Sequence, residues 1–396
     1  MKCKITNKKV NPFMSFGKMP IANGFLNKDK FNKEFFYEME VGFAEDLSLF
    51  QLNEHPKPKM MFNENYPFFT GSSQQMKLHF KEYAKWIKKY SKNKIKNIIE
   101  IGSNDGTFLK NFNSKDFNVL GFEPSGNVAD RAVKNGINTV SEFFNKNTII
   151  RQKKFVNNTD IICAANVICH VPDLNNLIQS VDSMLNSNGI FVFEEPYLGS
   201  MFEKVSYDQI YDEHIFIFSA TSVNKIFSLF NMELIDAFPQ VTHGGSMRYI
   251  IARKGKYKAS INVFKILENE KLRNLDNISS CEEFKKNCEL SKKKTRESLE
   301  KFKTNNYKIA GYAATSKSTT ILNYCNINNK IIDYICDTTP EKIGKFSPGT
   351  HIPIVDMNYF EKFTPDVAYL FAWNHKDEIL KKEKNYKGKW FSHVSL

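Results

Sequence analysis

Three side chains capable of acid–base chemistry lie within one short segment near the middle of the chain. Tyr211, Glu213 and His214 supply a phenol, a carboxylate and an imidazole. Imidazole has the side-chain pKa nearest neutrality, so His214 is the natural proton acceptor. Glu213 could orient that ring or bind a hydroxyl group, and Tyr211 could donate to an oxyanion. A polar cluster that only anchors the segment explains these residues equally well.

A second group of candidate residues surrounds a glycine turn. An apolar, β-branched run that includes Glu100 predicts a buried strand, and Gly102 and Gly106 then allow the backbone to turn sharply. An amphipathic run predicts a helix at 107–113. Backbone N–H groups point outward at such a turn and suit a nucleotide-like ligand. Glu123 ends the next strand, where a carboxylate would hold two ribose hydroxyls.

The order of residues in this turn differs from a nicotinamide dinucleotide fingerprint. The turn is E-x-G-x-x-x-G rather than G-x-G-x-x-G, and it resembles motif I of class I S-adenosylmethionine (SAM) methyltransferases. A generic β–α unit without a ligand is the less favoured interpretation. The predicted cofactor site comprises Glu100, Gly102, Asn104, Gly106, Glu123, Pro124 and Asn166.

Three further segments contain candidate site residues. His170 follows the fourth predicted strand, next to the methyl donor in such folds, although a packing role is as common. His243 and Arg248 flank two glycines that allow close approach to a ligand, and Arg248 could meet a phosphate; a simple hairpin turn is at least as plausible. Ser316 and Lys317 open a predicted helix and form a cradle for a diphosphate, or an ordinary capped helix start.

The elements that position these residues alternate between strands and helices, which predicts an α/β fold. Strands are predicted at 97–101, 118–123, 138–140, 159–164, 189–194, 232–237 and 247–253. Helices are predicted at 74–92, 107–113, 126–135, 174–186 and 221–230. The link between the last two strands is too short for a helix, which predicts an antiparallel hairpin at one edge of an otherwise parallel sheet.

Four segments are predicted along the chain. Residues 1–72 are rich in turns and aromatic residues, which predicts a small, mostly β or irregular domain. Residues 73–255 form the SAM domain and 256–305 a charged helical linker. Residues 306–396 restart the α/β pattern, with a strand at 308–312, a helix from Thr319 and a strand at 331–337, as a Rossmann-like domain.

Composition limits the class of protein. The net charge of +13 suits anionic partners, but the lysine-rich run 285–303 contains interspersed glutamates and is favoured as a solvated helix over an RNA-binding patch. The seven cysteines are irregularly spaced and form no C-x-x-C pair, so neither disulfides nor a metal site is expected. No apolar run is long enough to span a membrane, and we expect a cytoplasmic protein without membrane or nucleic-acid partners.

Segments spread over nearly the whole chain carry a family resemblance. They are FNENYPFFTGSS at 62–73, IEIGSNDG at 99–106, GFEPS at 121–125, ANVICHVPD at 165–173, YDEH at 211–214, FS at 218–219, HGGS at 243–246 and PGTHIPI at 348–354. The chain resembles the bacterial nucleotide-sugar C-methyltransferases that act on deoxysugars of the mycarose and tetronitrose kind. YDEH and PGTH are unusual strings, so the combined match is specific.

The resemblance implies a zinc-binding amino-terminal domain, a SAM domain and a carboxy-terminal Rossmann-like domain, in an enzyme of deoxysugar or polysaccharide biosynthesis. It implies that His214 is the base, with Tyr211, Glu213 and His170 lining the sugar site. The predicted substrate site is Tyr66, Phe68, His243, Arg248, Ser316 and Lys317. Of the family's amino-terminal zinc cysteines only Cys3 remains, and residues 38–43 stand where a second pair is expected. Zinc is therefore doubtful.

The leading hypothesis is a SAM-dependent C-methyltransferase that acts on a nucleotide-linked keto-deoxysugar and works as a monomer or weak homo-oligomer. An O- or N-methyltransferase on the same scaffold is the first alternative. An RNA-binding methyltransferase is suggested by the charge, and a catalytically silent partner protein by the lost cysteines.

Overall fold

Seven strands form the central sheet, and their order confirms the predicted topology. From one edge to the other they are β10 (Met232–Gln240), β11 (Ser246–Arg253), β8 (Leu185–Pro196), β7 (Thr159–Ala165), β4 (Asn97–Ile101), β5 (Asn118–Phe122) and β6 (Thr139–Val140). The pairs β8–β7, β7–β4, β4–β5 and β5–β6 are parallel, whereas β10–β11 and β11–β8 are antiparallel. The hairpin therefore lies at the edge of a parallel sheet, as in class I SAM methyltransferases.

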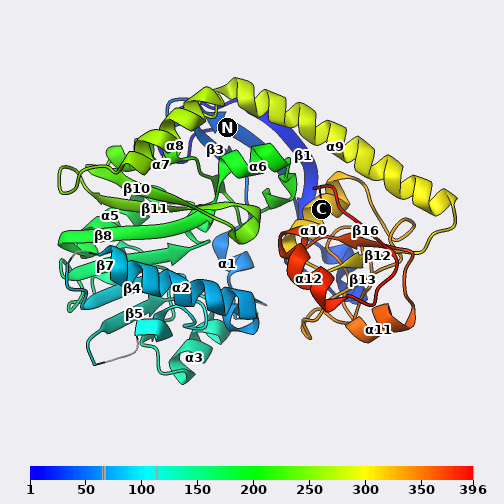
Figure 1. Cartoon of the computed structure of the whole chain (residues 1–396), viewed down its shortest axis with the longest axis horizontal. Helices are drawn as coiled ribbons and strands as arrows, with labels where there is room; N and C mark the ends of the chain where they lie inside the picture. The colour runs from blue at the N-terminus through cyan, green and yellow to red at the C-terminus, as the bar shows by residue number, and fades with distance from the viewer. Residues whose placement is uncertain (65, 67, 92, 113–114, 396) are drawn as a thin grey trace.

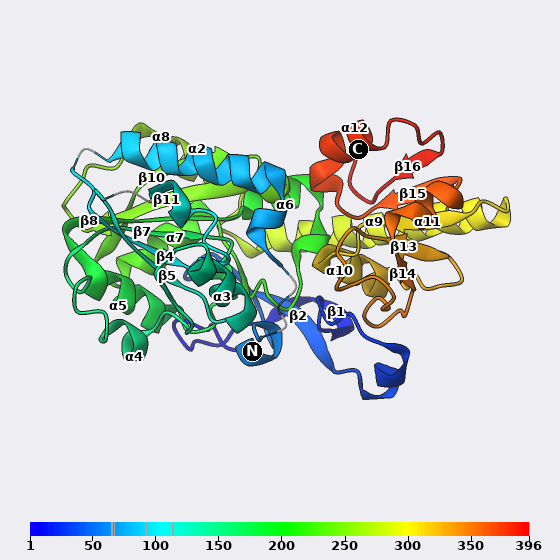
Figure 2. The same ribbon diagram turned by 90° about the horizontal axis from the view of Figure 1, so that it is seen from below.

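Helices cover both faces of this sheet. They are α2 (Gln74–Tyr90), α3 (Gly126–Lys134), α4 (Lys146–Ile149), α5 (Leu174–Met184) and α7 (Ala220–Ser228). Neighbouring strand residues face opposite layers: Ile98 belongs to the cluster that includes Phe80 of α2, and Ile99 to the cluster that includes Leu177 of α5. Figure 2 shows α2 on one side of the sheet and α5 on the other. Because both faces of the sheet are covered, the sequences of its central strands are nearly continuous apolar runs.

The helix predicted at 107–113 is wrong. The structure has turns followed by one short 3-10 helix, η3 (Leu109–Phe112). The Asn111 side-chain amide donates to the carbonyls of Thr107 and Phe108 at 3.1 and 2.9 Å. Asn side chains that bind nearby backbone compete with helix formation. The glycine turn therefore leads into a loop and not into a helix start.

The amino-terminal region forms a second, antiparallel sheet. Its strands are β1 (Pro12–Pro20), β2 (Phe36–Ala44), β3 (Leu49–Leu52) and β9 (Phe216–Ile217). The last strand comes from the long insertion after β8, which also contains α6 (Leu198–Lys204) and the 3-10 helix η5 (Tyr207–Gln209). Three short helices complete the region before α2: η1 (Lys28–Lys33), α1 (Pro58–Met61) and η2 (Thr70–Ser72). The insertion thereby ties the amino-terminal region to the central sheet.

The carboxy-terminal region is a parallel five-stranded sheet. Its order is β14 (Ile354–Val355), β13 (Tyr334–Cys336), β12 (Ile309–Tyr312), β15 (Val367–Leu370) and β16 (Lys389–Phe391). Its helices are α10 (Ser316–Tyr324), α11 (Met357–Lys362), η7 (Trp373–His375) and α12 (Lys376–Lys382). The helix expected from Thr319 starts at Ser316, because Thr315 and Ser318 form a reciprocal capping pair.

Two helices, α8 (Ile261–Leu272) and α9 (Ile278–Thr304), connect the central sheet to the carboxy-terminal one. Figure 1 shows α9 running along one side of the molecule, with the amino-terminal strands between the two α/β regions. The structure describes residues 1–64, 66, 68–91, 93–112 and 115–395. Asn65 and Pro67 of the resemblance segment, and the final residues 92 and 113 of two predicted helices, lie outside them. In this part of the chain no helix combines the length and apolarity needed to cross a membrane.

Candidate active site

The glycine turn after β4 has backbone conformations and close contacts that few other residues would permit. Gly102 and Gly106 have φ values of +66° and +78°, and Asn104 between them has φ +48°. A Cβ atom at Gly102 would lie 2.3 Å from Val167 Cγ2, and one at Gly106 would lie 2.7 Å from Ile137 Cγ1. Both positions therefore require glycine by conformation and by space.

Two buried carboxyl groups border this turn. Oε2 of Glu100 is buried without a hydrogen-bond partner among the described residues, and burial raises the pKa of this carboxyl well above its usual value. Glu123 accepts from the backbone N–H groups of Asn104 at 3.1 Å and Ser125 at 2.8 Å, directly before Pro124. An unpartnered buried acceptor and a carboxylate at the end of the second strand suit the polar groups of a nucleoside-containing cofactor.

Asn166 directly follows β7, the strand that flanks β4 on the side opposite to β5. It has φ +56°, its backbone N–H donates to the Glu194 carbonyl at 2.8 Å, and its side-chain oxygen is buried without a partner among the described residues. The 70–72 turn closes over the glycine turn, since the N–H groups of Thr70 and Gly71 donate to Asn104 and Asp105 at 2.8 and 2.9 Å. The residues of the predicted cofactor site thus gather around the carboxyl ends of β4, β5 and β7.

The imidazole of His214 has a fixed orientation. Its Nδ1 lies 2.6 Å from the carbonyl oxygen of Gln209, and its Nε2 lies 2.8 Å from the Tyr211 hydroxyl. A carbonyl only accepts, so Nδ1 carries the proton and the lone pair is on Nε2. Burial, followed by the proximity of His170, lowers the pKa of His214 well below its usual value. The ring is therefore neutral at pH 7, and the half-buried Tyr211, whose pKa is raised by desolvation, is protonated.

The carboxyl groups of Asp212 and Glu213 are also buried. Glu213 accepts from the Asn23 side-chain amide at 2.7 Å and the Tyr66 hydroxyl at 3.4 Å, and Asp212 accepts from the Ala22 N–H at 3.1 Å. Burial raises the pKa of both groups, and for Asp212 the adjacent Glu213 adds to the rise. This pair therefore retains a proton at higher pH than ordinary carboxyl groups do.

His170 lies on the 3-10 helix η4 (Ile168–His170), after β7. Its ring stacks on that of His214 with centroids 5.3 Å apart and on that of Phe62 at 5.6 Å. Burial lowers the pKa of His170 to about 3. The structure therefore brings His170, Tyr211, Glu213, His214 and Tyr66 into one cluster, contributed by the amino-terminal region, the central domain and the insertion.

The carboxy-terminal region borders the same cluster through the start of α10. The Ser316 hydroxyl donates to Asn23 at 3.2 Å, which links it to Glu213. Lys317 Nζ lies 3.3 Å from Asn374 Oδ1 and 4.9 Å from the Trp373 ring centroid, and burial lowers the pKa of Lys317.

His243 belongs to η6 (Thr242–Gly244), which contacts η7 of the carboxy-terminal region. Its Nε2 is buried without a partner among the described residues. Burial, followed by the charge of Lys317, lowers the pKa of His243 to about 3. These contacts place a lysine and a histidine at the junction between the two α/β regions.

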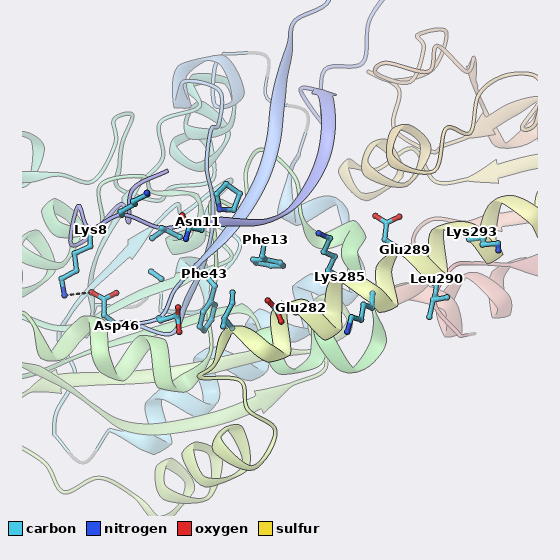
Figure 3. A pocket seen from close by; sticks show the side chains of 17 residues that line it. Lys8, Asn11, Phe13, Phe43, Asp46, Glu282, Lys285, Glu289, Leu290 and Lys293 are labelled. Carbon is cyan, nitrogen blue, oxygen red and sulfur yellow. Dashed lines mark ion pairs between the residues drawn. The ribbon is translucent and has the colours of Figure 1, made fainter.

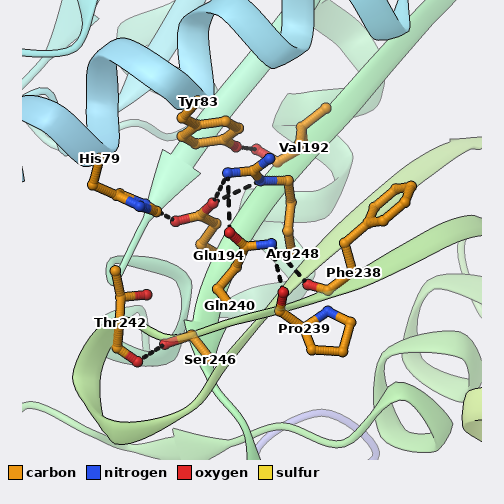
Figure 4. Close-up of polar contacts among 10 residues, drawn as sticks. All are labelled: His79, Tyr83, Val192, Glu194, Phe238, Pro239, Gln240, Thr242, Ser246 and Arg248. Atoms are coloured by element: carbon orange, nitrogen blue, oxygen red, sulfur yellow. Dashed lines mark hydrogen bonds and ion pairs between the residues drawn. The ribbon is translucent and has the colours of Figure 1, made fainter.

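Arg248 and Phe68 lie apart from this junction. Phe68 is 48% exposed, and its carbonyl accepts from the side-chain amide of Asn104 in the glycine turn at 3.2 Å. Figure 4 shows Arg248 beside Glu194 of β8, which also lies 2.6 Å from Nε2 of His79 on α2. The Arg248 guanidinium lies over the Tyr83 ring at 3.9 Å. Burial raises the pKa of Glu194, but the contacts with His79 and Arg248 outweigh it and lower the pKa below its usual value.

A large groove lies away from these residues, between the amino-terminal sheet and α9 (Figure 3). Its volume is about 1260 Å³. Five lysines line it, Lys8, Lys9, Lys285, Lys286 and Lys293, together with the acidic residues Glu45, Asp46, Glu282 and Glu289. The mixed charge does not favour a polyanion, which agrees with the interpretation of the lysine-rich run as a solvated helix.

The amino-terminal region does not contain a zinc ligand set in its described residues. Cys3 is fully buried, accepts from the Thr6 N–H at 3.5 Å, and packs in one apolar cluster with Ile5, Val10, Ala44 and Leu47. In the described chain, three or more potential ligands gather within metal-binding distance at Cys169, His170 and His214, which is outside this region. The residues of the amino-terminal region thus do not fit zinc.

Sequence reasoning missed Asn23, Ala22, Asp212 and His79. Asn23 and Ala22 contact residues 190 positions later in the chain, and His79 contacts one 115 positions later. No local pattern could have indicated Ala22 or Asn23, since only the fold brings them to the insertion. Asp212 is part of the YDEH string, and its position between Tyr211 and Glu213 was a usable signal.

Comparisons with known proteins match the chain in three consecutive parts. Residues 3–62 match the family described as "Putative zinc binding domain", 75–237 match "Methyltransferase domain" and 241–394 match "C-methyltransferase C-terminal domain". The C-methyltransferase NovU of Streptomyces niveus is 25% identical over 376 residues, which cover 94% of this chain and 89% of NovU.

Two similar solved structures each match less than half of the chain. The PH0226 protein of Pyrococcus horikoshii is 13% identical with a TM-score of 0.37, over 47% of this chain and 95% of that one. A SAM-dependent methyltransferase of Thermotoga maritima is 17% identical with a TM-score of 0.36, over 45% and 88%. Together, the sheet topology, the three consecutive family matches and the likeness to NovU show a SAM-dependent methyltransferase that is similar to the C-methyltransferases.

Proposed function

We propose that this enzyme methylates a carbon next to the ketone of a nucleotide-linked keto-deoxysugar. The observation that carries the proposal is the orientation of His214, whose Nδ1–H donates to Gln209 and whose Nε2 lone pair meets the Tyr211 hydroxyl. The likeness to the C-methyltransferase NovU supports attack by carbon. We propose the four predicted segments, 1–72, 73–255, 256–305 and 306–396, as the domains that carry out this reaction.

The cofactor would be held at the carboxyl ends of β4, β5 and β7. Glu123 would exchange its backbone donors for ribose hydroxyls, while the glycine turn and the unpartnered Glu100 and Asn166 oxygens would meet polar groups of the cofactor. When bound, SAM supplies an electrophilic methyl group.

Proton removal is assigned to His214. A carbon is a poor nucleophile until it loses a proton, and the ketone beside it makes that proton acidic. The substrate C–H would displace the Tyr211 hydroxyl from His214 Nε2; the C–H bond breaks, the proton goes to Nε2, and the electron pair moves toward the ketone oxygen as an enolate. The enolate carbon would then be the nucleophile for the methyl group of bound SAM, whose sulfur–methyl bond would break to leave S-adenosylhomocysteine.

The displaced Tyr211 hydroxyl becomes a donor for the developing oxyanion. Tyr211 is protonated because burial raises its pKa, and a protonated Glu213 would be a second donor for the same or a neighbouring oxygen. His170 stacks on His214 and would keep the base in position. Burial of His214 and Glu213 strengthens the interactions that they make.

The nucleotide diphosphate is assigned to the junction between the α/β regions. Lys317 and Ser316 lie at the start of α10, and His243 lies opposite with a free buried nitrogen among the described residues. Tyr66 reaches Glu213 and would border the sugar, with Phe68 near the cofactor turn. We also propose that Arg248 contacts a phosphate, which would require its guanidinium to leave Glu194.

O- or N-methylation on this scaffold is the second candidate, because an O-methyltransferase also needs a base. An RNA-binding methyltransferase is less favoured, since the groove beside the lysine-rich helix has mixed charge. We further propose a monomer or weak homo-oligomer in deoxysugar or polysaccharide biosynthesis.

Hydrogen–deuterium exchange tests carbon activation separately from methyl transfer. A thymidine diphosphate keto-deoxysugar is incubated with the enzyme in D₂O and S-adenosylhomocysteine, and deuterium beside the ketone is followed by NMR. Exchange that requires His214 supports the proposal. Methyl transfer to the reduced sugar without any exchange would replace it with O-methylation.

Calorimetric titration with S-adenosylhomocysteine and with thymidine diphosphate provides the binding control. Binding of both, with His214→Ala retaining both, shows that a loss of exchange is not a loss of folding. Absence of S-adenosylhomocysteine binding in folded protein would contradict the assigned cofactor site.

A further inference from the structure

A soft ligand set lies inside the proposed sugar site. Cys169 Sγ and one nitrogen each of His170 and His214 lie within 4.8 Å of one another. Cys169 and His170 are neighbours on η4, whereas His214 arrives from the insertion, and the two imidazoles stack at an interplanar angle of 21°. The fold therefore gathers one sulfur and two nitrogens from two separate segments.

One of the ligand atoms is unpartnered, and a second is oriented by its neighbours. Nε2 of His170 is buried and has no hydrogen-bond partner among the described residues. The contact between His214 Nδ1 and the Gln209 carbonyl directs the lone pair of Nε2 into the cluster, as backbone carbonyls do for metal-ligating histidines. Cys169 is fully buried and forms no disulfide.

We propose that Cys169, His170 and His214 form an inhibitory site for a thiophilic divalent cation of the Zn²⁺ class. One thiolate and two imidazoles suit Zn²⁺ or Co²⁺ and not Mg²⁺ or Ca²⁺, which prefer oxygen ligands. With Zn–S of about 2.3 Å and Zn–N of about 2.0 Å, tetrahedral ligand atoms lie about 3.5 Å apart, so atoms that now lie within 4.8 Å of one another would have to approach by at most about 1.3 Å on binding.

Binding would remove the base that the proposed function requires. The cation takes the Nε2 lone pair of His214, displaces the Tyr211 hydroxyl, and releases the Cys169 thiol proton to solvent. A water molecule would complete the fourth position. The inhibitory part of this inference rests on the proposed function, whereas the binding part does not.

Cobalt titration tests binding without any methyl acceptor. We expect one Co²⁺ per chain and a thiolate-to-cobalt charge-transfer band in the near ultraviolet. Cys169→Ser should abolish the band, and His170→Gln should weaken Co²⁺ affinity at least about tenfold. Cys336→Ser is the matched control, because Cys336 is equally buried and its thiol donates to the Gly311 carbonyl, a contact that serine can keep.

Some results of the cobalt titration would contradict the proposed metal site. A folded wild-type protein without the band, or a band that survives Cys169→Ser or disappears in Cys336→Ser, would overturn the site. Near-ultraviolet circular dichroism of each variant without metal verifies that it is folded.

Zinc inhibition tests the functional consequence. Zn²⁺ should inhibit deuterium exchange and methyl transfer by the wild type, a chelator should restore both, and Cys169→Ser should raise the inhibitory concentration at least about tenfold. Equal inhibition of wild type and Cys169→Ser would overturn inhibition at this site. If no sugar is turned over, the proposed function fails while the cobalt titration still decides the metal site.

Discussion

The Nε2 atom of His214 lies 2.8 Å from the hydroxyl of Tyr211, three residues earlier in the chain. The two groups hold each other in position, and because Nδ1 of the ring donates to the Gln209 carbonyl, the hydroxyl is the proton donor and the Nε2 atom the acceptor. A substrate that enters this pair would find a base and a donor already oriented.

Removal of either member should therefore slow the same two steps, for different reasons. We expect His214→Ala to lower deuterium exchange and methyl transfer by about 10²–10⁴-fold, the range for general base catalysis. Tyr211→Phe should retain the base and lower both rates by about 10²-fold or more, as loss of an oxyanion donor does. Rates and S-adenosylhomocysteine affinity are measured together. Unchanged exchange in His214→Ala would reject His214 as the base.

Gly102→Ala should weaken cofactor binding. The new Cβ would meet Val167 at 2.3 Å, and the backbone has φ +66°. Gly255→Ala is the matched control, because Gly255 has φ +77° but nothing within 4 Å of the added carbon. Strain alone should destabilise either variant by about 1 kcal/mol, whereas Gly102→Ala should also lose at least about tenfold in S-adenosylhomocysteine affinity by calorimetry. Similar affinities in the two variants would argue against close approach at Gly102.

The buried pair Asp212 and Glu213 should make stability depend on pH. Burial raises the pKa of both above that of the unfolded chain. Their contribution to stability is present in full below the ordinary carboxyl pKa of about 4 and is lost as the pH rises through the raised values. The unfolding temperature of Glu213→Gln should thus fall less steeply toward alkaline pH than that of the wild type. Glu203→Gln, at an exposed carboxyl on α6, should keep the wild-type slope; a wild-type slope in Glu213→Gln would contradict the assignment.

Glu194→Ala should be strongly destabilising. It leaves the buried Arg248 guanidinium without its carboxylate, a change worth about 3–5 kcal/mol in comparable pairs. Adding Arg248→Leu should recover part of that loss, since no unpaired buried charge remains. Urea unfolding of both single variants and the double variant measures the coupling. Strictly additive losses would show that the pair is not coupled.

The amino-terminal domain should keep its stability without metal. Its single cysteine packs in an apolar cluster, so a chelator should leave the unfolding temperature unchanged. The measurement is made in Cys169→Ser, so that metal at the proposed inhibitory site does not contribute. A chelator-dependent loss of stability in that variant would show that residues 3–62 bind metal after all.

The strands and the cofactor turn could be predicted because their signals are local. The isoleucines around Glu100 and the spacing of Gly102 and Gly106 carry the β4–turn pattern within ten residues. The prediction of a helix at 107–113 failed because the Asn111 side chain binds the carbonyls of Thr107 and Phe108. Hydrophobic periodicity contains no information about such hydrogen bonds.

The sequence indicated several residues of the proposed sugar site but not the contacts that bring them together. The unusual YDEH string indicated Tyr211 and His214. The hydrogen-bond partners of Glu213, however, are Asn23 and Tyr66, which lie far away in sequence. The acceptor that fixes the imidazole is a backbone carbonyl, at Gln209, and side-chain identity carries no information about it. Such contacts follow from tertiary packing alone.

Strand β9 has a consequence for how the chain is made. The amino-terminal sheet pairs Phe50 and Gln51 of β3 with Ile217 and Phe216, and Leu52 donates to the Ile215 carbonyl. During synthesis on a ribosome, β3 therefore stays an open edge until the insertion has emerged, long after residues 1–72 are complete. Exposed edges invite pairing with other chains, so the nascent amino-terminal segment is the part most in need of chaperone protection.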